Sequence, residues 1–356
     1  MTEARTEVRH PAANRAAGPS LPFRPDIEGL RGVAVAAVVL FHAGVPGVGG
    51  GYIGVDVFLV ISGFLLTSLT MREVAATGEL ALLRFLGRHA RRVLPAASVV
   101  LVTVTVAGYH WLGQRRGDEI ASDGRWAALF ASNFNLAAQG VDYLRAQAAP
   151  SPLQHLWSLA VGAQLGVLWP ALLALLIWLG LRHATPAVLG LAVAGSLACS
   201  VWQAGAPWSY FSPATRAWEL GAGCLLALVA GHLSRIPAGL SAAMAGAGLA
   251  GIVVAALSFT DGTPFPGHAA LLPVVATVLV LAGRGDAVLG WAPLRWVGRI
   301  SYPLYLWHWP LLVIAEQAYG PLSGRTRAGL VLLGVVLAIC TYVLVENPIR
   351  QWRTSR

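Results

Sequence analysis

Arg31 and His42 stand eleven positions apart in an otherwise apolar run, GLRGVAVAAVVLFHAG. At about 100° per residue, eleven residues make three helical turns plus about 20°, so both side chains lie on one helix face. A rise of about 1.5 Å per residue puts them roughly 16 Å apart along the axis. Ionisable groups in apolar segments are costly and usually face a bundle interior or a cavity. The run therefore predicts a helix that carries a cation at one depth and a titratable base at another.

Asp56 follows in YIGVDVFLVISGF, at the start of the next apolar run. The intervening GVPGVGGG is a short turn, so we expect Asp56 to return to a depth close to that of His42. A carboxylate beside a histidine can fix its tautomer and raise its basicity. The spacing leaves two interpretations open. His42 is a base, oriented by Asp56, that takes a proton from an acceptor hydroxyl, or the two residues form a structural pair that closes the helical hairpin.

A second polar face is predicted in ISYPLYLWHWP, near the C-terminal end of the chain. Helical spacing places Ser301, Tyr305 and His308 on one face, at i, i+4 and i+7. The prolines of this segment weaken its backbone hydrogen bonds. We interpret Trp307 and Trp309 as part of an interfacial aromatic belt.

Two further apolar runs open with polar residues. SPLQHLWSLAVGAQ sets His155, Ser158 and Gly162 on one helix face, and TRAWELGAG sets Arg216 and Glu219 at i, i+3. The simplest interpretation of the second motif is an ion pair at a helix end, because pairing lowers the cost of burying each charge.

Composition identifies the kind of fold that must position these side chains. Of the 356 residues, 56% are hydrophobic and only 12% are charged, whereas soluble domains carry about 25% charged residues. The mean hydropathy is +0.64, which favours a polytopic membrane protein. The net charge of +9 comes from short arginine clusters between apolar runs, which indicates cytoplasmic loops rather than a nucleic-acid partner. The sequence contains no Walker loop, HExxH, GxSxG or Cys/His metal spacing, so we expect no bound metal.

Ten runs supply the roughly 20 mainly apolar residues that a helix needs to cross a bilayer. They are 27–45, 52–71, 94–112, 155–181, 185–204, 217–234, 238–258, 268–283, 300–318 and 327–346. The predicted fold class is therefore all-α, a polytopic integral membrane bundle of about ten transmembrane helices. Placing both termini in the cytoplasm puts most arginine clusters on that side. Segment 78–95 is too basic to span, and we expect it to lie at the cytoplasmic surface as an interfacial amphipathic helix.

Taken in order, the motifs resemble the integral-membrane acyltransferase-3 family. This family includes bacterial O-antigen and exopolysaccharide O-acetyltransferases and macrolide acyltransferases. The resemblance rests on RPDIEGLRGVAV…LFH, GVDVFLVISGFL, RHARRVLP, SPLQHLWSLAV, TRAWELGAG, ISYPLYLWHWPLL and VENPIR. One such motif would be weak evidence, but seven in the same order are strong. The resemblance implies three regions: a disordered cytoplasmic tail over 1–22, the transmembrane acyltransferase domain over 23–350, and a short cytoplasmic tail over 351–356.

The resemblance also implies an activity and a location. It implies transfer of an acyl group, commonly acetyl from acetyl-CoA, to a hydroxyl of a glycan or a glycosylated small molecule. Acyl-CoA is then a donor substrate, with no permanently bound cofactor. The expected location is the bacterial cytoplasmic membrane, in contact with membrane lipid.

Candidate site residues fall into three sets. The resemblance implies that Arg31 and His42 are essential and that the histidine is catalytic, and we add Asp56 as its partner. A basic rim can hold the phosphates of a donor, and the donor set is Arg88, Arg91, Arg92, Tyr305 and His308. The acceptor set is His155, Ser158, Gln164, Arg216 and Glu219.

Two departures from the family pattern keep a second function open. The family usually has a glutamate where this chain has Gly162, and the glycines here could widen a cavity for a bulkier acyl group or acceptor. The motifs most resemble members that carry an additional SGNH hydrolase-like domain. Either transfer to the acceptor is direct, a separate SGNH-type partner completes it, or this is a shortened chain. The alternative function is a relay that moves an acyl group or a lipid-linked sugar without autonomous transfer.

Overall fold

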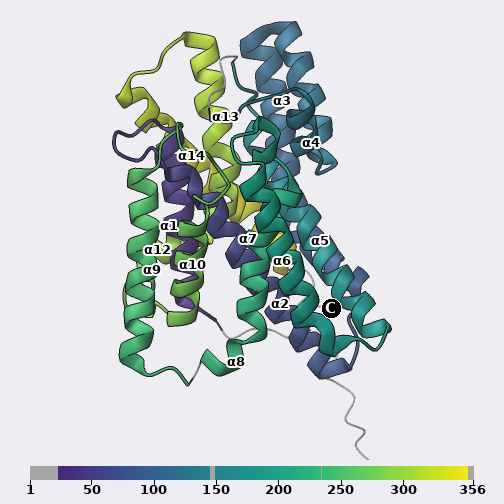
Figure 1. Ribbon diagram of the computed structural model, residues 1–356. Coiled ribbons are helices and arrows are strands. Elements are labelled where there is room, and N and C mark those ends of the chain that lie inside the picture. The colour runs from purple at the N-terminus through teal and green to yellow at the C-terminus, as the bar shows by residue number, and fades with distance from the viewer. Residues whose placement is uncertain (1–22, 145–148, 234, 352–356) are drawn as a thin grey trace, which may run out of the picture.

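The computed structural model describes residues 23–144, 149–233 and 235–351, and every regular element within them is helical (Figure 1). The longer helices are α1 (Pro25–His42), α2 (Gly54–Thr77), α3 (Leu82–Ala128), α5 (Trp157–Trp178), α6 (Thr185–Trp202), α7 (Pro213–Leu228), α9 (Ala238–Ser258), α10 (Leu271–Gly283), α13 (Ser301–Tyr319) and α14 (Gly324–Thr341). The shorter helices are α4 (Ser132–Ala138), α8 (Ala230–Leu233), α11 (Asp286–Leu289), α12 (Ala292–Arg299) and α15 (Asn347–Gln351). Single turns are η1 (Gly51–Ile53), η2 (Gln154–Leu156), η3 (Arg182–Ala184), η4 (Pro207–Tyr210) and the π-helical η5 (Tyr342–Glu346). The predicted tail over 1–22 lies outside the described residues, as do residues 352–356 of the C-terminal tail.

Six helical stretches in the described part of the chain are long and apolar enough to cross a membrane. They are Gly51–Thr77, Leu82–Ala128, Gln154–Trp178, Arg182–Trp202, Ala238–Ser258 and Gly324–Ile349. Each of the ten predicted ranges contains a helix, but α7 and α10 have only 16 and 13 residues, and α1 and α13 are more polar. The all-helical membrane fold is therefore confirmed, whereas the count of ten spans remains a prediction.

Helix α3 is a helical hairpin and not one straight rod. Its backbone leaves the helical region at Gly113, where φ is 81° and ψ is 174°, a conformation that glycine adopts without a steric penalty. A Cβ on Gly108 would meet Ile120, and one on Gly117 would meet Tyr109. These contacts show that the second arm folds back along the first. The predicted end of the span at residue 112 falls directly before this turn.

The first arm of α3 begins at the arginine-rich end of the bundle. The separate interfacial helix predicted over 78–95 is wrong, because α3 starts at Leu82 and continues through Pro95. At the same end, Glu28 near the start of α1 pairs with Arg295 and Arg299 of α12, each at 3.4 Å. We call this the basic end, and the end with the Gly113 turn the hairpin end. Figure 1 shows the hairpin end uppermost.

Helices α2 and α7 pack closely because glycines meet backbone at their crossing. A Cβ added to Gly63 would collide with the carbonyl oxygen of Leu220, and one added to Gly223 would collide with that of Val60. Small residues allow this close approach in membrane bundles, where packing and polar contacts replace the hydrophobic effect. The crossing also brings the start of α2 beside the start of α7.

We predict that Gly223→Leu destabilises the fold, because the added side chain must push α2 and α7 apart. Overpacking of this kind costs about 1–3 kcal/mol, which thermal unfolding of the detergent-purified protein measures. Gly195→Leu on α6 is the matched control, because Gly195 is exposed and has nothing within 4 Å of an added Cβ. Equal unfolding temperatures for the two variants would contradict the close crossing.

Candidate functional site

Two imidazoles meet where α1 ends. Nδ1 of His42 lies 2.9 Å from Nε2 of His308 on α13, and the two rings stack with their centroids 5.1 Å apart. The other nitrogen of His42, Nε2, lies 3.0 Å from the hydroxyl oxygen of Tyr143. Nδ1 of His308 lies 2.7 Å from the backbone carbonyl oxygen of Tyr305. The four groups therefore form one continuous hydrogen-bonded chain.

The direction of each hydrogen bond in this chain follows from its last member. A carbonyl oxygen only accepts, so Nδ1 of His308 carries a proton and donates it to Tyr305. With both imidazoles neutral, Nε2 of His308 is then an acceptor, and Nδ1 of His42 must be the donor. This assignment leaves the lone pair on Nε2 of His42 directed at Tyr143.

Tyr143 supplies the hydrogen bond that this lone pair accepts. It lies in the loop after α4, and its ring stacks on Tyr210 at a centroid distance of 4.5 Å. Burial raises the pKa of Tyr143 well above its usual value, so the hydroxyl stays protonated at neutral pH and can donate. Tyr143 was not predicted from the sequence, because it lies in a polar connecting segment without helical periodicity. The Tyr143 hydroxyl thus occupies the position beside Nε2 of His42 that a substrate hydroxyl would need to give its proton to this nitrogen.

Arg31, like His42, contacts α13. Its guanidinium donates to the hydroxyl of Ser301 at 2.9 Å, two turns of α13 before His308. The predicted shared face of Arg31 and His42 therefore packs against the predicted shared face of α13. The structure therefore confirms both predicted helix faces, the one with Arg31 and His42 and the one with Ser301 and His308.

A cavity of about 520 Å³ begins beside Arg31 and extends to the basic end. Arg88 and Arg92 line it there, and Arg88 pairs with Glu73 at 2.8 Å. Its middle is apolar, between α2 and α5. Of the three predicted donor arginines, Arg91 is exposed and does not line this cavity. The cavity thus joins a cationic entrance to the polar pair formed by Arg31 and Ser301.

Tyr305 separates this cavity from the histidines. Its side chain lines the cavity, and its hydroxyl donates to the backbone carbonyl of His155 at 2.7 Å. The hydroxyl of Ser158 lies 2.7 Å from that of Tyr305. The ring of His155 lies 5.3 Å from the Tyr305 ring and 5.7 Å from the His308 ring, centroid to centroid. Two predicted acceptor residues and two predicted donor residues therefore meet at one wall.

Asp56 does not orient His42, and the predicted contact between them is wrong. Oδ1 of Asp56 accepts from Nη1 of Arg216 at 2.9 Å, and Oε1 of Glu219 accepts from the same nitrogen at 2.9 Å. These three side chains are at most 1% exposed. The Arg216 guanidinium also lies 4.7 Å above the ring of Tyr210. The predicted Arg216–Glu219 pair is confirmed, but it belongs to a buried cluster that ties α2 to α7.

Gln164 also lies away from the cavity. Its amide nitrogen donates to the backbone carbonyl of Phe130 at 2.7 Å and to Oδ1 of Asn133 at 2.8 Å. It therefore fixes α4 and the preceding turn against α5. The predicted contact of Gln164 with substrate is not supported by this position.

The interpretation of Trp307 and Trp309 as an aromatic belt is wrong. Trp307 is buried, and its indole nitrogen donates to the hydroxyl of Thr341 at 2.9 Å. The ring of Trp309 lies 4.5 Å from that of His42, and its nitrogen donates to the carbonyl of Ser151 at 2.9 Å. Both indoles face protein because each finds a hydrogen-bond acceptor there.

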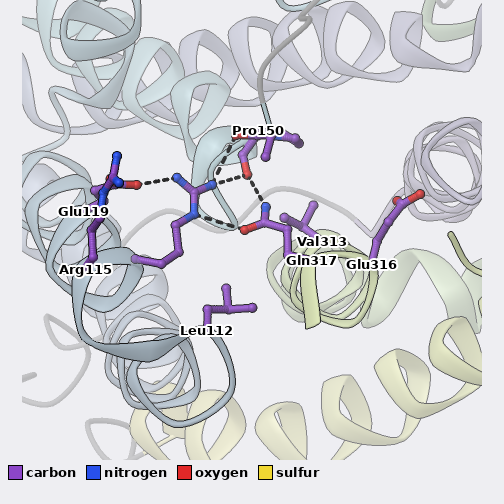
Figure 2. Close-up of a pocket in the computed structure, with 9 residues that line it drawn as sticks. Leu112, Arg115, Glu119, Pro150, Val313, Glu316 and Gln317 are labelled. Carbon is purple, nitrogen blue, oxygen red and sulfur yellow. Dashed lines mark hydrogen bonds and ion pairs between the residues drawn. The ribbon is translucent and has the colours of Figure 1, made fainter. Parts of the chain in front are cut away.

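A second cavity, of about 690 Å³, opens at the hairpin end between α3 and α13 (Figure 2). The guanidinium of Arg116 spans it, donating to Gln317 at 3.0 Å, to Glu119 at 2.7 Å and to the carbonyl of Pro150 at 2.9 Å. Gln317 donates to the same carbonyl at 2.7 Å. These bonds hold the chain at Pro150 against both helices.

This outer cavity ends close to the histidine pair. Val313 lines it, and Trp309, which contacts His42, lies one turn earlier on the same face of α13. The two cavities therefore approach the His42–His308 pair from opposite ends of the bundle.

Comparison with known proteins finds one matching family and several similar proteins. Residues 24–346 match the acyltransferase domain family called acyltransferase-3. BcsY of Komagataeibacter xylinus, named as a membrane-bound transacylase, is 33% identical over 91% of this chain and 82% of its own length. The peptidoglycan O-acetyltransferase OatA of Listeria monocytogenes is 33% identical over 93% of this chain, and OatA of Staphylococcus aureus is 29% identical over 92%. The chain spans only 56% and 57% of the lengths of these two relatives. No solved structure matches the chain.

We predict that Arg216→Met strongly destabilises the protein, because it leaves the carboxylates of Asp56 and Glu219 buried without their cation. Removing one partner of a buried ion pair costs about 3–5 kcal/mol, which thermal unfolding in detergent measures. Arg115→Met is the control, because Arg115 is 96% exposed. An unchanged unfolding temperature for Arg216→Met would contradict a structural role for the cluster.

Proposed function

The chain belongs to the acyltransferase-3 family, and from this premise we propose that it is a membrane O-acyltransferase. It moves an acyl group from acyl-CoA to a hydroxyl of a glycan or a glycosylated small molecule. The observation that carries the proposal is the contact of 3.0 Å between Nε2 of His42 and the hydroxyl of Tyr143, with His308 hydrogen-bonded to the other nitrogen of the same ring.

In this proposal the bundle crosses a bacterial cytoplasmic membrane ten times, with both termini in the cytoplasm. The support is that the arginines of the first arm of α3 and those of α12 gather at the basic end, as the positive-inside rule requires of a cytoplasmic face. The hairpin end then faces outward. Residues 23–350 form the acyltransferase domain, and membrane lipid surrounds it.

His42 acts as the general base. The acceptor hydroxyl replaces Tyr143 at Nε2 and gives its proton to that nitrogen as its oxygen attacks the thioester carbonyl carbon. The intermediate collapses, the carbon–sulfur bond breaks, and the sulfur takes the proton from Nε2. The products are an ester and free coenzyme A. His308 is a positioning residue, since its hydrogen bond fixes the His42 tautomer and disperses charge on the imidazolium.

The donor enters the inner cavity from the basic end. Arg88 and Arg92 hold its phosphates by charge-assisted hydrogen bonds, and Arg31 holds the polar arm or stabilises charge that develops during transfer. Because Tyr305 lies between the cavity and His42, its hydrogen bond with Ser158 must open to let the thioester pass.

The acceptor enters from the hairpin end. The lining of the outer cavity combines charged side chains, the amide of Gln317 and the backbone carbonyl of Pro150 with apolar surface, which suits the hydroxyls and the ring faces of a sugar. The OatA relatives are named as O-acetyltransferases, one of them as a peptidoglycan O-acetyltransferase, which supports a cell-envelope glycan as the acceptor. Transfer to a separate SGNH-type partner, which then acylates the glycan, is the second candidate.

We predict that His42→Ala lowers acyl transfer by about 10²–10⁴-fold, the usual contribution of a general base. The assay follows label from radiolabelled acetyl-CoA into glycan acceptors, in vesicles that hold the purified chain. His232→Ala is the control, because His232 is exposed on α8. Equal transfer by wild type and His42→Ala would exclude His42 as the base. Donor binding without transfer in either protein would favour the relay.

We predict that Arg88→Gln with Arg92→Gln raises the KM for acetyl-CoA at least tenfold, with kcat changed little, because the phosphates remain far from the reacting carbon. The effect should shrink as salt rises, since ions screen exposed charges. Arg84→Gln is the control, because this exposed arginine does not line the cavity. A lower kcat with an unchanged KM would contradict phosphate binding at this entrance.

A further inference from the structure

One wall of the inner cavity, on α5, includes two glycines. Ser158, Gly162 and Gly166 of α5 recur every four residues, so they share one helix face, and all three line the cavity. A Cβ on Gly162 would approach only Leu59, at 4.0 Å, and a Cβ on Gly166 would have nothing within 4 Å. The space beside these glycines is therefore open cavity and not a packed helix contact.

The facing wall on α2 is mainly apolar. Leu59, Leu65, Leu66 and Leu69 line it, with the hydroxyl of Ser62 between them. The eight helical steps from Ser158 to Gly166 give the groove between these walls a length of about 12 Å. An extended alkyl chain of up to about ten carbons fits this length, at about 1.3 Å of advance per bond.

The groove suits an alkyl chain better than the polar arm of coenzyme A. That arm contains amide groups, which need hydrogen-bond partners when they leave water. The backbone of α5 uses its own amides within the helix, and the leucines offer no partner. Apart from the hydroxyls of Ser62 and Ser158, which lie at the walls of the groove, most polar groups of the cavity lie near Arg31 and Ser301 or at the arginine entrance. The cavity is thus divided into a polar path and an apolar side groove.

We propose that this groove, bounded by Gly162 and Gly166, holds the acyl chain of the donor and makes the enzyme select medium-chain acyl groups over acetyl. This inference rests on the proposed function and specifies its donor. The thioester lies beside Ser158 and Tyr305. From there the acyl chain of the donor folds back along α5, past Gly162 and Gly166. Each methylene that leaves water for the groove adds roughly a fourfold gain in affinity.

The test compares octanoyl-CoA with acetyl-CoA as donors to the same glycan acceptor in vesicles. Wild type should show a kcat/KM for octanoyl-CoA at least equal to that for acetyl-CoA. Gly162→Leu should lower the octanoyl-to-acetyl ratio of kcat/KM at least tenfold, because the new side chain fills the groove. Gly195→Leu on α6 is the matched control and should leave the ratio unchanged.

Each other outcome has a definite meaning. Acetyl transfer by wild type without octanoyl transfer would overturn this inference and leave the proposed function standing. If Gly162→Leu kept the wild-type octanoyl-to-acetyl ratio, the acyl chain would bind elsewhere, and this inference would also be overturned. A Gly162→Leu variant that fails to fold is replaced by Gly166→Leu, for which the same loss of ratio is expected. No transfer from any donor would overturn the proposed function and this inference together.

Discussion

The hydrogen bond from His308 to the carbonyl of Tyr305 sets the chemistry of the whole site. A carbonyl cannot donate, so this one contact of 2.7 Å fixes the proton on His308 and, through it, the proton on His42. The basic nitrogen of His42 is consequently the one that faces Tyr143. Helices α1 and α13 must stay in register for this chain to exist, and the contact of Arg31 with Ser301 holds the same register at the other end.

The buried charges of the bundle divide into two groups with different tasks. Arg216 lies between two carboxylates and against aromatic rings, an arrangement that pairs its charge and joins α2 to α7. The cations of the inner cavity are placed differently, because they line open space. Charge in an apolar bundle is costly; Arg216 is held by carboxylates inside the protein, whereas Arg31, Arg88 and Arg92 line a cavity that an anionic ligand can enter.

Much of this arrangement was predictable from residue spacing, and the failures have physical causes. Helical periodicity put Arg31 and His42 on one face and Ser301 and His308 on another, and both predictions hold because spacing determines the face of a straight helix. Periodicity does not determine which helix lies opposite. Asp56 was assigned to His42 because the two are close in sequence, but α7 supplied Arg216 as a stronger partner for the carboxylate. Tyr143 lies in a loop, where no periodic signal exists.

The most direct test of this account is the protonation of His42 in the resting protein. Nitrogen NMR of ¹⁵N-histidine-labelled protein in lipid nanodiscs distinguishes the two neutral tautomers, and comparison with His42→Gln assigns the signal. The account predicts a neutral ring with the proton on Nδ1 and an unprotonated Nε2. A proton on Nε2 with a bare Nδ1 would contradict it, because no lone pair would then face the hydroxyl to be acylated.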